Sequence, residues 1–345
     1  MLCSCQFIAI VTGTMASEAP PDPFEPPFKP PFWLRGAHAQ TIYGSLWAPV
    51  YIPSWVRQRW STPDQDFIHV DRLDQRAEAP VLVIFHGLEG SSASRYVRAL
   101  ANAAAALGWN VLAPNFRSCS GELNHRPRLY HAGDSSEIQW ILRTVQREFP
   151  FSARFAVGVS LGANMLLKWL GEQAQQATVL LAGAVAVAPP IDLQQVALNL
   201  SRGFNQLYTQ YFLFSLKRKA QQKALQYPGL LDLTPIMAAR SMRDFDHHCI
   251  APLHGFRDAE DYWFRSSSKP WLKSIALPTL VLMARDDPFL PSALHSLRGE
   301  GSSALLWEHP FCGGHVGFVS GSFPGKMHWM PRRVMRFLAA TLRVA

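Results

Sequence analysis

Short apolar runs rich in β-branched residues alternate with longer amphipathic stretches from about residue 80 onward. The run at 79–85 (APVLVIF) is continuously apolar, which is typical of a strand buried on both faces of a parallel sheet. Further strand-like runs lie at 109–116, 154–159, 183–188, 277–284 and 304–308. Helical patterns occur between the earlier runs, at 94–107, 134–148 and 161–172. This alternation predicts an α/β fold with a mostly parallel central sheet and helices on both faces.

The alternation stops between residues 190 and 270, where no good strand pattern occurs. This segment is rich in helical patterns and holds an aromatic stretch at 204–214. Its length and place predict a helical cap inserted into the sheet domain. We therefore expect three parts, which are an N-terminal extension with a Pro-rich arm at 1–30, an α/β core at 31–191 and 271–345, and a helical cap at 192–270.

The Pro-rich segment at 20–33 carries Phe24, Phe28 and Phe32 at intervals of four residues. It could be a polyproline ligand for a partner domain, but we favour an extended arm that packs its phenyl rings on its own chain. The first 18 residues have an apolar middle and no Lys or Arg before Phe7, so a secretory signal has little support. We expect Met15 to be the true start.

Composition narrows the class of protein. Of the 345 residues, 48% are hydrophobic and 17% are charged, which provides for a sizeable core and argues against disorder. No apolar run reaches 18 residues, so no membrane-spanning helix is expected. The five cysteines are scattered and form no CxxC pair, which favours a reducing, cytoplasmic compartment.

The net charge of +8 is compatible with a nucleic-acid or membrane-surface partner. No nucleic-acid fold signature accompanies Lys217, Arg218 and Lys219, so we expect no nucleic acid and interpret these cations as a solvated face. Apolar residues recur every three or four positions at 204–212, which suits either a membrane-surface helix or a cap helix over an active site. Packing over the site is favoured over peripheral membrane contact, and the oligomeric state stays open.

The pentapeptide Gly158-Val-Ser160-Leu-Gly162 matches the G-x-S-x-G nucleophile elbow. A strand pattern precedes it and a helical pattern follows, as the motif requires. The residues two before and two after the serine must be small because the turn is tight. A serine hydroxyl is a poor nucleophile near neutral pH, so it needs a base, and the base needs a third group to orient it.

The acid is expected between the serine and the histidine in chain order. Asp286 and Asp287 follow the strand-like run at 277–284. Asp287 begins an Asp-x-x-x-Pro turn and is the expected acid, whereas Asp286 is interpreted as a turn or capping carboxylate.

His315 is the expected base, because it lies in a glycine-rich loop (Gly313-Gly-His315-Val-Gly317) after the last strand-like run. His309 and His328 lack such glycines and are expected to be packing or surface residues. Ser160, Asp287 and His315 all follow strands, whose carboxyl ends meet at one edge of an open α/β sheet.

The oxyanion formed during acyl transfer needs two N–H donors. We expect the Leu161 N–H, in the first turn of the elbow helix, and the Leu88 N–H, in the loop His86-Gly-Leu-Glu-Gly90. His86 follows directly on a buried strand, so we interpret it as orienting this loop and not as the base.

Several blocks of the chain together resemble the YheT-like branch of the α/β-hydrolases. They are His86-Gly-Leu-Glu-Gly90-Ser, Asn115-Phe-Arg-Ser-Cys119-Ser-Gly121-Glu, Tyr130-His131, Gly158-Val-Ser160-Leu-Gly162-Ala-Asn164, Asp286-Asp287-Pro288-Phe289 and Gly313-Gly-His315-Val-Gly317-Phe318. The resemblance extends from about Gly36 to the C-terminus. It implies a triad on Ser160, Asp287 and His315, and hydrolysis of lipid or short acyl esters. The chain departs at Ser118, where the family usually has glycine.

These observations predict a serine esterase that acts on a small-molecule ester and needs neither cofactor nor metal. The stretch 244–249 (DFDHHC) holds metal-ligating residue types, but adjacent histidines rarely share an ion and no second cluster accompanies it. The stretch 204–214 and Tyr262-Trp263-Phe264 are expected to line an apolar acyl pocket for short to medium chains or acylglycerol-like esters. The alternatives are an acyltransferase with the same triad and a non-catalytic binding protein.

Overall fold

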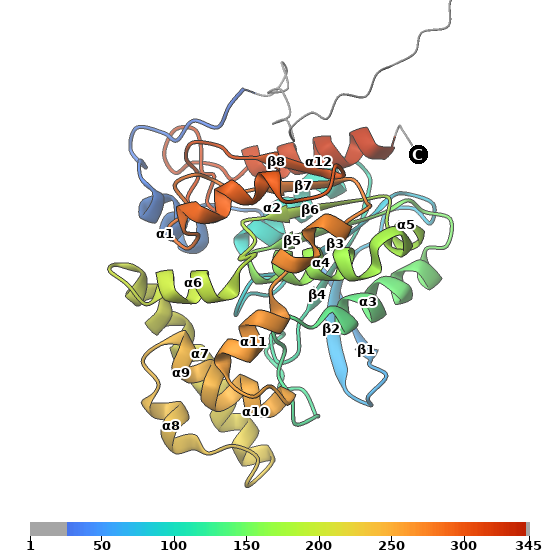
Figure 1. Ribbon diagram of the computed structural model, residues 1–345. Helices are drawn as coiled ribbons and strands as arrows, with labels where there is room; N and C mark the ends of the chain where they lie inside the picture. Colours follow the sequence, from blue (N-terminus) through green and yellow to red (C-terminus); the bar gives the residue numbers. More distant parts are fainter. Residues whose placement is uncertain (1–25, 343–345) are drawn as a thin grey trace, which may run out of the picture.

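The computed structural model describes residues 26–342, which form one eight-stranded sheet flanked by helices (Figure 1). The strand order is β1-β2-β4-β3-β5-β6-β7-β8, with parallel pairing from β4 to β8 and antiparallel pairing at β1–β2 and β2–β4. The strands are β1 (Val56–Ser61), β2 (Phe67–Leu73), β3 (Val81–Phe85), β4 (Asn110–Asn115), β5 (Arg154–Val159), β6 (Gly183–Val187), β7 (Thr279–Leu282) and β8 (Leu305–Glu308). The predicted mostly parallel sheet is confirmed.

The six strands expected from apolar runs are all present, with ends that differ by at most two residues from the prediction. β3, β6 and β7 are buried at every position, which explains their continuous apolar sequences. The antiparallel strands β1 and β2 were not expected. β1 (VRQRWS) is a mostly exposed edge strand, and its Arg57 is ion-paired with Asp71 of β2 at 2.8 Å, so its sequence lacks the apolar signal.

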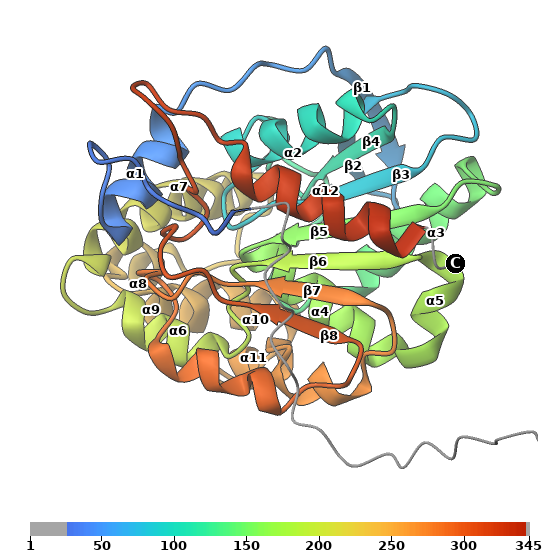
Figure 2. The same cartoon turned by 90° about the horizontal axis from the view of Figure 1, so that it is seen from above.

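Helices cover both faces of the sheet, as Figure 2 shows. The helix α2 (Arg95–Ala106) packs with α12 (Trp329–Leu342) on one face, and α1 (Ala37–Leu46) lies against α2. On the other face α4 (Leu161–Gln173) crosses β5 and β6, and α3 (Ser135–Glu148) and α5 (Ala177–Leu180) pack beside it. Short 3-10 helices occupy Ala174–Gln176, Lys269–Ser274 and Ser292–Gly299.

Between β6 and β7 the chain is helical. These helices gather at the lower left of Figure 1, and we propose that residues 192–270 form the cap. They are α6 (Leu193–Leu200), α7 (Asn205–Gln226), α8 (Leu233–Ala238), α9 (Met242–Phe245), a π-helix (Asp246–Ile250), α10 (Ala251–His254) and α11 (Ala259–Ser266). Side chains of Asp192, Asp232, Ser241 and Asp258 accept hydrogen bonds from the first turns of α6, α8, α9 and α11, which explains where these helices begin.

The Pro-rich arm packs on the body of the chain at Phe28. This side chain is 6% exposed, and its ring lies edge-on to Phe318 and Trp329 at 5.2 and 5.4 Å. Phe32 is 81% exposed, so the expectation that every ring packs inward is wrong there. Phe24, Met15 and the other residues of 1–25 lie outside the described residues.

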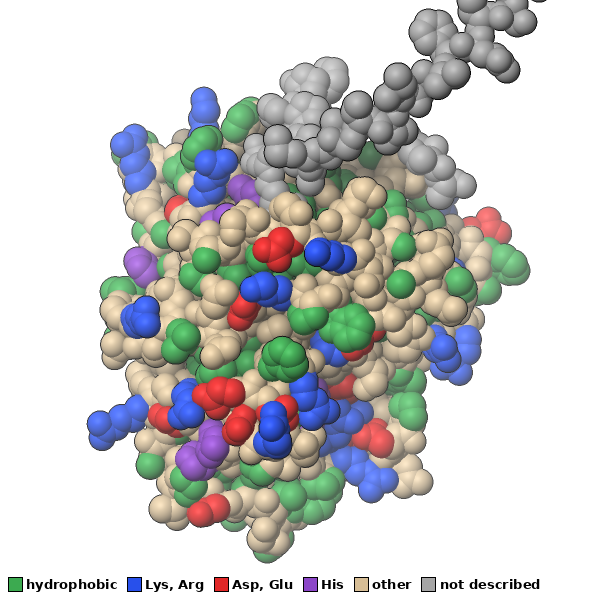
Figure 3. Space-filling view, viewed as in Figure 1, with side chains coloured by type: hydrophobic (Ala, Val, Ile, Leu, Met, Phe, Trp, Pro, Cys, Tyr) green, Lys and Arg blue, Asp and Glu red, His purple; other side chains and the backbone are tan. Residues whose placement is uncertain are grey.

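Charge is mixed on the visible surface. Figure 3 shows basic and acidic side chains interspersed over this face, without one continuous basic patch. No helix within residues 26–342 is both long enough and apolar enough to span a bilayer.

Candidate active site

Ser160 occupies the turn between β5 and α4. Its φ of 53° and ψ of −121° place it in a backbone region that L-residues rarely adopt. A Cβ at Gly162 would lie 2.5 Å from the carbonyl oxygens of Phe85 and His86, and one at Gly158 would lie 2.5 Å from the Gly162 carbonyl oxygen. Only glycine at these two positions allows so tight a turn.

Two hydrogen bonds connect Ser160 to a histidine and an aspartate from distant loops. Ser160 Oγ lies 2.8 Å from His315 Nε2, and His315 Nδ1 lies 2.8 Å from Asp287 Oδ2. The Asp287 side chain is fully buried, and its Oδ1 accepts a hydrogen bond from the Phe289 N–H at 2.9 Å. An imidazole that donates Nδ1–H to the carboxylate presents its Nε2 lone pair to the serine hydroxyl, which is the arrangement a general base requires.

Within the described part of the chain, the alternative candidates for the acid and the base are not bonded to Ser160. Asp286 Oδ1 accepts a hydrogen bond from the Gly314 N–H at 3.0 Å, so this carboxylate holds the loop that carries His315. Burial, together with the neighbouring Asp287 charge, raises the pKa of Asp286. His309 Nδ1 lies 3.1 Å from His295 Nδ1, and His328 is exposed. The structure brings neither of these two histidines to Ser160.

The expected oxyanion donors lie next to Ser160. Leu161 is the first residue of α4, and the first N–H groups of a helix have no partner within it. On either side of Leu88, the N–H groups of Gly87 and Glu89 donate to the Tyr96 and Tyr130 hydroxyls at 2.9 and 2.7 Å. Within residues 26–342 the Leu88 N–H has no such acceptor, so it is available to a ligand.

His86 is a structural residue in this arrangement. Its Nδ1–H donates to the Gly87 carbonyl at 2.8 Å, and its Nε2 accepts from the Phe116 N–H at 3.0 Å. Burial lowers the pKa of His86 to about 4, so the imidazole is neutral at physiological pH. It connects the loop after β3 to Phe116, in the loop after β4. The sequence had indicated only that it orients the first of these loops.

Two cavities meet at Ser160. The first, of about 110 Å³, lies between the core and the cap and is lined mostly by apolar side chains. The second, of about 380 Å³, lies between α1, the loop after β3 and α7. The residues that line both cavities are Leu88, Ser160, Phe212, Phe289 and His315.

A family model described as the α/β-hydrolase fold matches residues 80–322. YheT of Escherichia coli (strain K12) is 37% identical over 326 residues, which cover 91% of this chain and 94% of that protein. This chain belongs to the YheT-like α/β-hydrolases. The protein named phospholipase ABHD3 of Mus musculus is 26% identical over 91% of this chain and 78% of its own length.

A solved structure with the same fold is the Pyrococcus furiosus esterase Pf2001. It has a TM-score of 0.55 and 15% identity, and the match covers 86% of this chain and 98% of that one. The α/β-hydrolase fold is therefore shown independently of sequence similarity. By its family, this chain is an enzyme of the hydrolase class.

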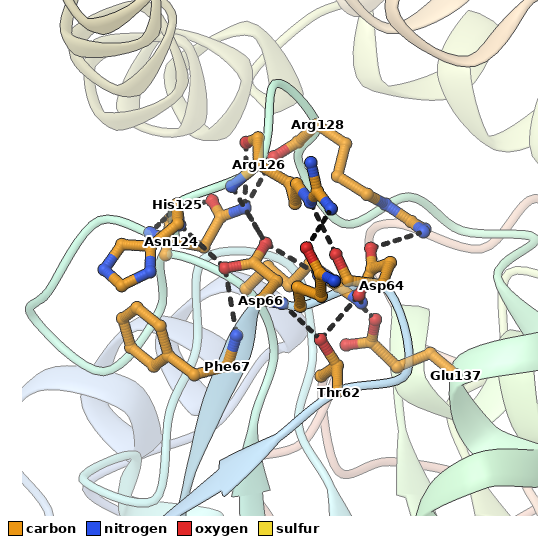
Figure 4. A network of polar contacts seen from close by, with 12 residues as sticks. Thr62, Asp64, Asp66, Phe67, Asn124, His125, Arg126, Arg128 and Glu137 are labelled. Carbon is orange, nitrogen blue, oxygen red and sulfur yellow. Dashed lines mark hydrogen bonds and ion pairs between the residues drawn. The ribbon is translucent and has the colours of Figure 1, made fainter.

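The loop after β4 contains the departure from the YheT-like pattern at Ser118. Its φ is 62°, a region that costs a non-glycine residue about 1–2 kcal/mol. The Ser118 hydroxyl donates to Asn124 Oδ1 at 2.6 Å, and Asn124 Nδ2 donates to the buried Asp66 at 2.6 Å (Figure 4). These side-chain hydrogen bonds stabilise the loop with Ser118 at positive φ, a position where the family usually has glycine.

Of the aromatic residues expected to line the acyl pocket, some line a cavity and others are exposed to solvent. Tyr262 and Trp263 line the first cavity, and Phe212 lines both. Phe264 was wrongly expected to do so; it is exposed, because three consecutive residues of α11 cannot share one helix face.

In the stretch DFDHHC at residues 244–249, His247 and His248 contact each other while Asp246 is buried. Within residues 26–342 no three potential ligand side chains converge as in a metal site.

Sequence reasoning missed the contribution of α1. Thr41 Oγ1 accepts a hydrogen bond from the His315 N–H at 2.9 Å. A Cβ at Gly44 would lie 2.6 Å from Gly317 Cα, so the helix packs directly on the histidine loop. No motif marks α1. The residues of α1 at these contacts, Thr41 and Gly44, are small. Their size indicates a close approach only once the two segments are known to be in contact.

Proposed function

We propose that this protein is a serine esterase that hydrolyses carboxylic esters with short to medium acyl chains, including acylglycerol-like esters. The observation that supports this most directly is the series of hydrogen bonds from Ser160 through His315 to Asp287, each of 2.8 Å. The names of two similar proteins, which describe one as an esterase and the other as a phospholipase, are consistent with ester substrates.

The proposed reaction begins when His315 Nε2 takes the proton of Ser160 Oγ, which attacks the ester carbonyl carbon. Asp287 keeps the imidazole in the reactive tautomer and stabilises its positive charge. The carbonyl oxygen becomes an oxyanion that accepts hydrogen bonds from the Leu88 and Leu161 N–H groups.

Collapse of this intermediate breaks the bond to the alkoxide, which leaves as the alcohol with the proton from His315. A water molecule then gives a proton to His315 Nε2 and attacks the acyl-enzyme. The second collapse releases the carboxylic acid and returns the proton to Ser160. No step calls for a cofactor or a metal ion.

The first cavity is the proposed acyl pocket because its lining is mostly aliphatic and aromatic. Each methylene that it buries contributes about 0.8 kcal/mol, so kcat/KM is expected to rise about fourfold per carbon until the cavity is full.

A series of p-nitrophenyl esters from acetate to palmitate tests the proposal. The wild-type protein is expected to show a rising and then falling profile, and Ser160→Ala to lose about 10⁵- to 10⁶-fold in kcat. Ser160→Ala is also expected to lose labelling by a fluorophosphonate while keeping its circular dichroism spectrum. Labelling that persists would identify another nucleophile, and a flat profile would contradict acyl selection.

An acyltransferase is the second candidate, because the larger cavity beside Ser160 offers room for an alcohol acceptor. Product analysis in the presence of glycerol separates the two reactions, since transfer yields a new ester and hydrolysis yields the free acid. A protein that binds esters but turns none of them over would instead be a binding protein.

We place the activity in the cytoplasm. Cys119, Cys249 and Cys312 are free thiols, as a reducing compartment would keep them. Cell fractionation with an antibody to the chain tests this location.

A further inference from the structure

The first cavity contains a carboxyl group that the proposed mechanism does not use. Asp246 is 6% exposed and is the first residue of the π-helix Asp246–Ile250. Its side chain lines the cavity that also contains Ser160. Its Oδ2 accepts a hydrogen bond from Trp263 Nε1–H at 2.8 Å, and Trp263 lines the same cavity.

No cation neutralises this carboxyl within residues 26–342. The charged and imidazole groups that share the cavity have their own partners: Lys219 is paired with Glu89 at 2.7 Å, His315 is bonded to Asp287, and His131 Nδ1 accepts from the Gly133 N–H at 3.2 Å. The two tyrosines of the cavity are bonded as well: the Tyr130 hydroxyl donates to Glu89, and the Tyr262 hydroxyl accepts from the Ala132 N–H. The remaining neighbours are mainly apolar. Because burial is opposed only by the indole hydrogen bond, it raises the pKa of Asp246 to about 7.

A lone carboxyl in apolar surroundings is destabilising unless its hydrogen-bonding capacity is used. A leucine of similar size would fill the same space without this penalty. The π-helix adds to the case, because such segments are rare and occur frequently at functional sites. In this segment Asp246 faces the cavity, whereas the adjacent His247 is exposed.

We propose that Asp246, oriented by Trp263, binds a hydroxyl group on the acyl chain of the ester substrate. A hydroxyl can accept a hydrogen bond from the protonated carboxyl and donate one to the carboxylate, so it is bound in both protonation states. An oxo group can only accept a hydrogen bond, so it would bind only to the protonated carboxyl. An amine in its charged form can only donate, so it would bind only to the carboxylate. This inference rests on the proposed function, since it places the acyl chain in the first cavity.

The test compares p-nitrophenyl octanoate with its ω-hydroxy derivative and with isomers that carry the hydroxyl nearer the middle of the chain. The quantity measured is the ratio of kcat/KM for the best hydroxy ester to kcat/KM for the plain ester. Asp246→Leu is expected to lower this ratio about tenfold or more, because the loss on the hydroxy ester exceeds any change on the plain ester. A misfolded variant would lose both activities together.

Two further variants control the experiment. Asp246→Asn keeps an acceptor for Trp263 and a donor for the substrate, so it is expected to keep a preference for the hydroxy ester. His247→Asn changes the adjacent, exposed residue of the same helical turn and is expected to leave the ratio unchanged.

The outcomes separate the inference from the proposed function. If both esters are hydrolysed but Asp246→Leu leaves the ratio unchanged, the hydroxyl site is overturned while the esterase proposal stands. A preference for an oxo- or amino-acyl ester, or for a hydroxyl on the alcohol part, would also overturn it. If no ester is hydrolysed, calorimetry of Ser160→Ala with octanamide and hydroxyoctanamide makes the same comparison, and equal affinities would overturn the hydroxyl site.

Discussion

Two adjacent carboxylates, Asp286 and Asp287, make different contacts although they share one loop. Asp287 accepts a hydrogen bond from the His315 ring, and Asp286 accepts from backbone N–H groups, among them that of Gly314. Asparagine at 287 would present either an amide oxygen or an NH₂ group to the histidine, and the orienting negative charge would be lost. Asparagine at 286 keeps an oxygen that accepts the Gly314 N–H.

Asp287→Asn is therefore expected to lower kcat for ester hydrolysis by about 10⁴-fold, and Asp286→Asn by no more than a few-fold. Steady-state kinetics on one p-nitrophenyl ester measures both effects, with thermal unfolding to verify that each variant is folded. Equal losses in the two variants would show that Asp287 has no special role in orienting the base.

At the scale of elements, the helix α7 attaches the cap to the loops that surround Ser160. Lys219 is paired with Glu89 of the loop after β3. Lys223 is fully buried, and its ammonium donates to the carbonyl oxygens of Asn124 and Arg126 in the loop after β4, at 2.5 and 2.7 Å. Burial lowers the pKa of Lys223 to about 8, although the Asp66 charge opposes this shift. The ammonium also donates to Gln226 Oε1 at 2.9 Å.

Lys223→Met is expected to lower the free energy of unfolding by about 1–3 kcal/mol, because it removes the ammonium donor of the Asn124 carbonyl and one of the two donors of the Arg126 carbonyl. Limited proteolysis should then cut the cap helices faster than in the wild type. Arg218→Met, at an exposed position of the same helix, is the matched control and is expected to have little effect. Equal protease sensitivity of the two variants would show that Lys223 does not anchor the cap.

At the scale of the whole molecule, stability depends on pH through a buried cluster around Asp66 (Figure 4). Burial alone would raise the pKa of Asp66, but hydrogen bonds from Asn124, His125, Arg117 and Phe67 outweigh it and lower the pKa to about 2. A depressed pKa stabilises the folded state above the ordinary carboxyl pKa, and this stabilisation is lost as pH falls towards 2.

Asp66→Asn is therefore expected to destabilise the protein at neutral pH, by about 1–2 kcal/mol for the charge effect alone, and to flatten the fall in stability between about pH 4 and pH 2. Urea unfolding at a series of pH values measures the slope. Glu78→Gln, at an exposed carboxylate, is the control. If Asp66→Asn leaves the slope of the unfolding free energy against pH unchanged, the acid sensitivity has another source.

The sequence by itself determined where six of the strands lie along the chain and which residues form the elbow. Strands buried in a parallel sheet must be apolar along their length, so β3 and β5 are visible as runs without any knowledge of their neighbours. The elbow is equally local, because the close approach of its backbone demands glycine at 158 and 162. Chain order, the Asp-x-x-x-Pro turn and the loop glycines then predicted Asp287 and His315. In the structure His315 is hydrogen-bonded to both Ser160 and Asp287.

Only the tertiary structure decided the contacts between segments whose patterns carry no information about their partner. The edge strand β1 is polar because solvent covers most of it, so it has no apolar signal. The helix α1 supports the His315 loop through contacts between residues more than 270 positions apart. The inward turn of Asp246 depends on a π-helix and on Trp263 in another helix. Periodicity specifies how much of a segment is buried, but the identity of the neighbour follows from how all the segments pack together.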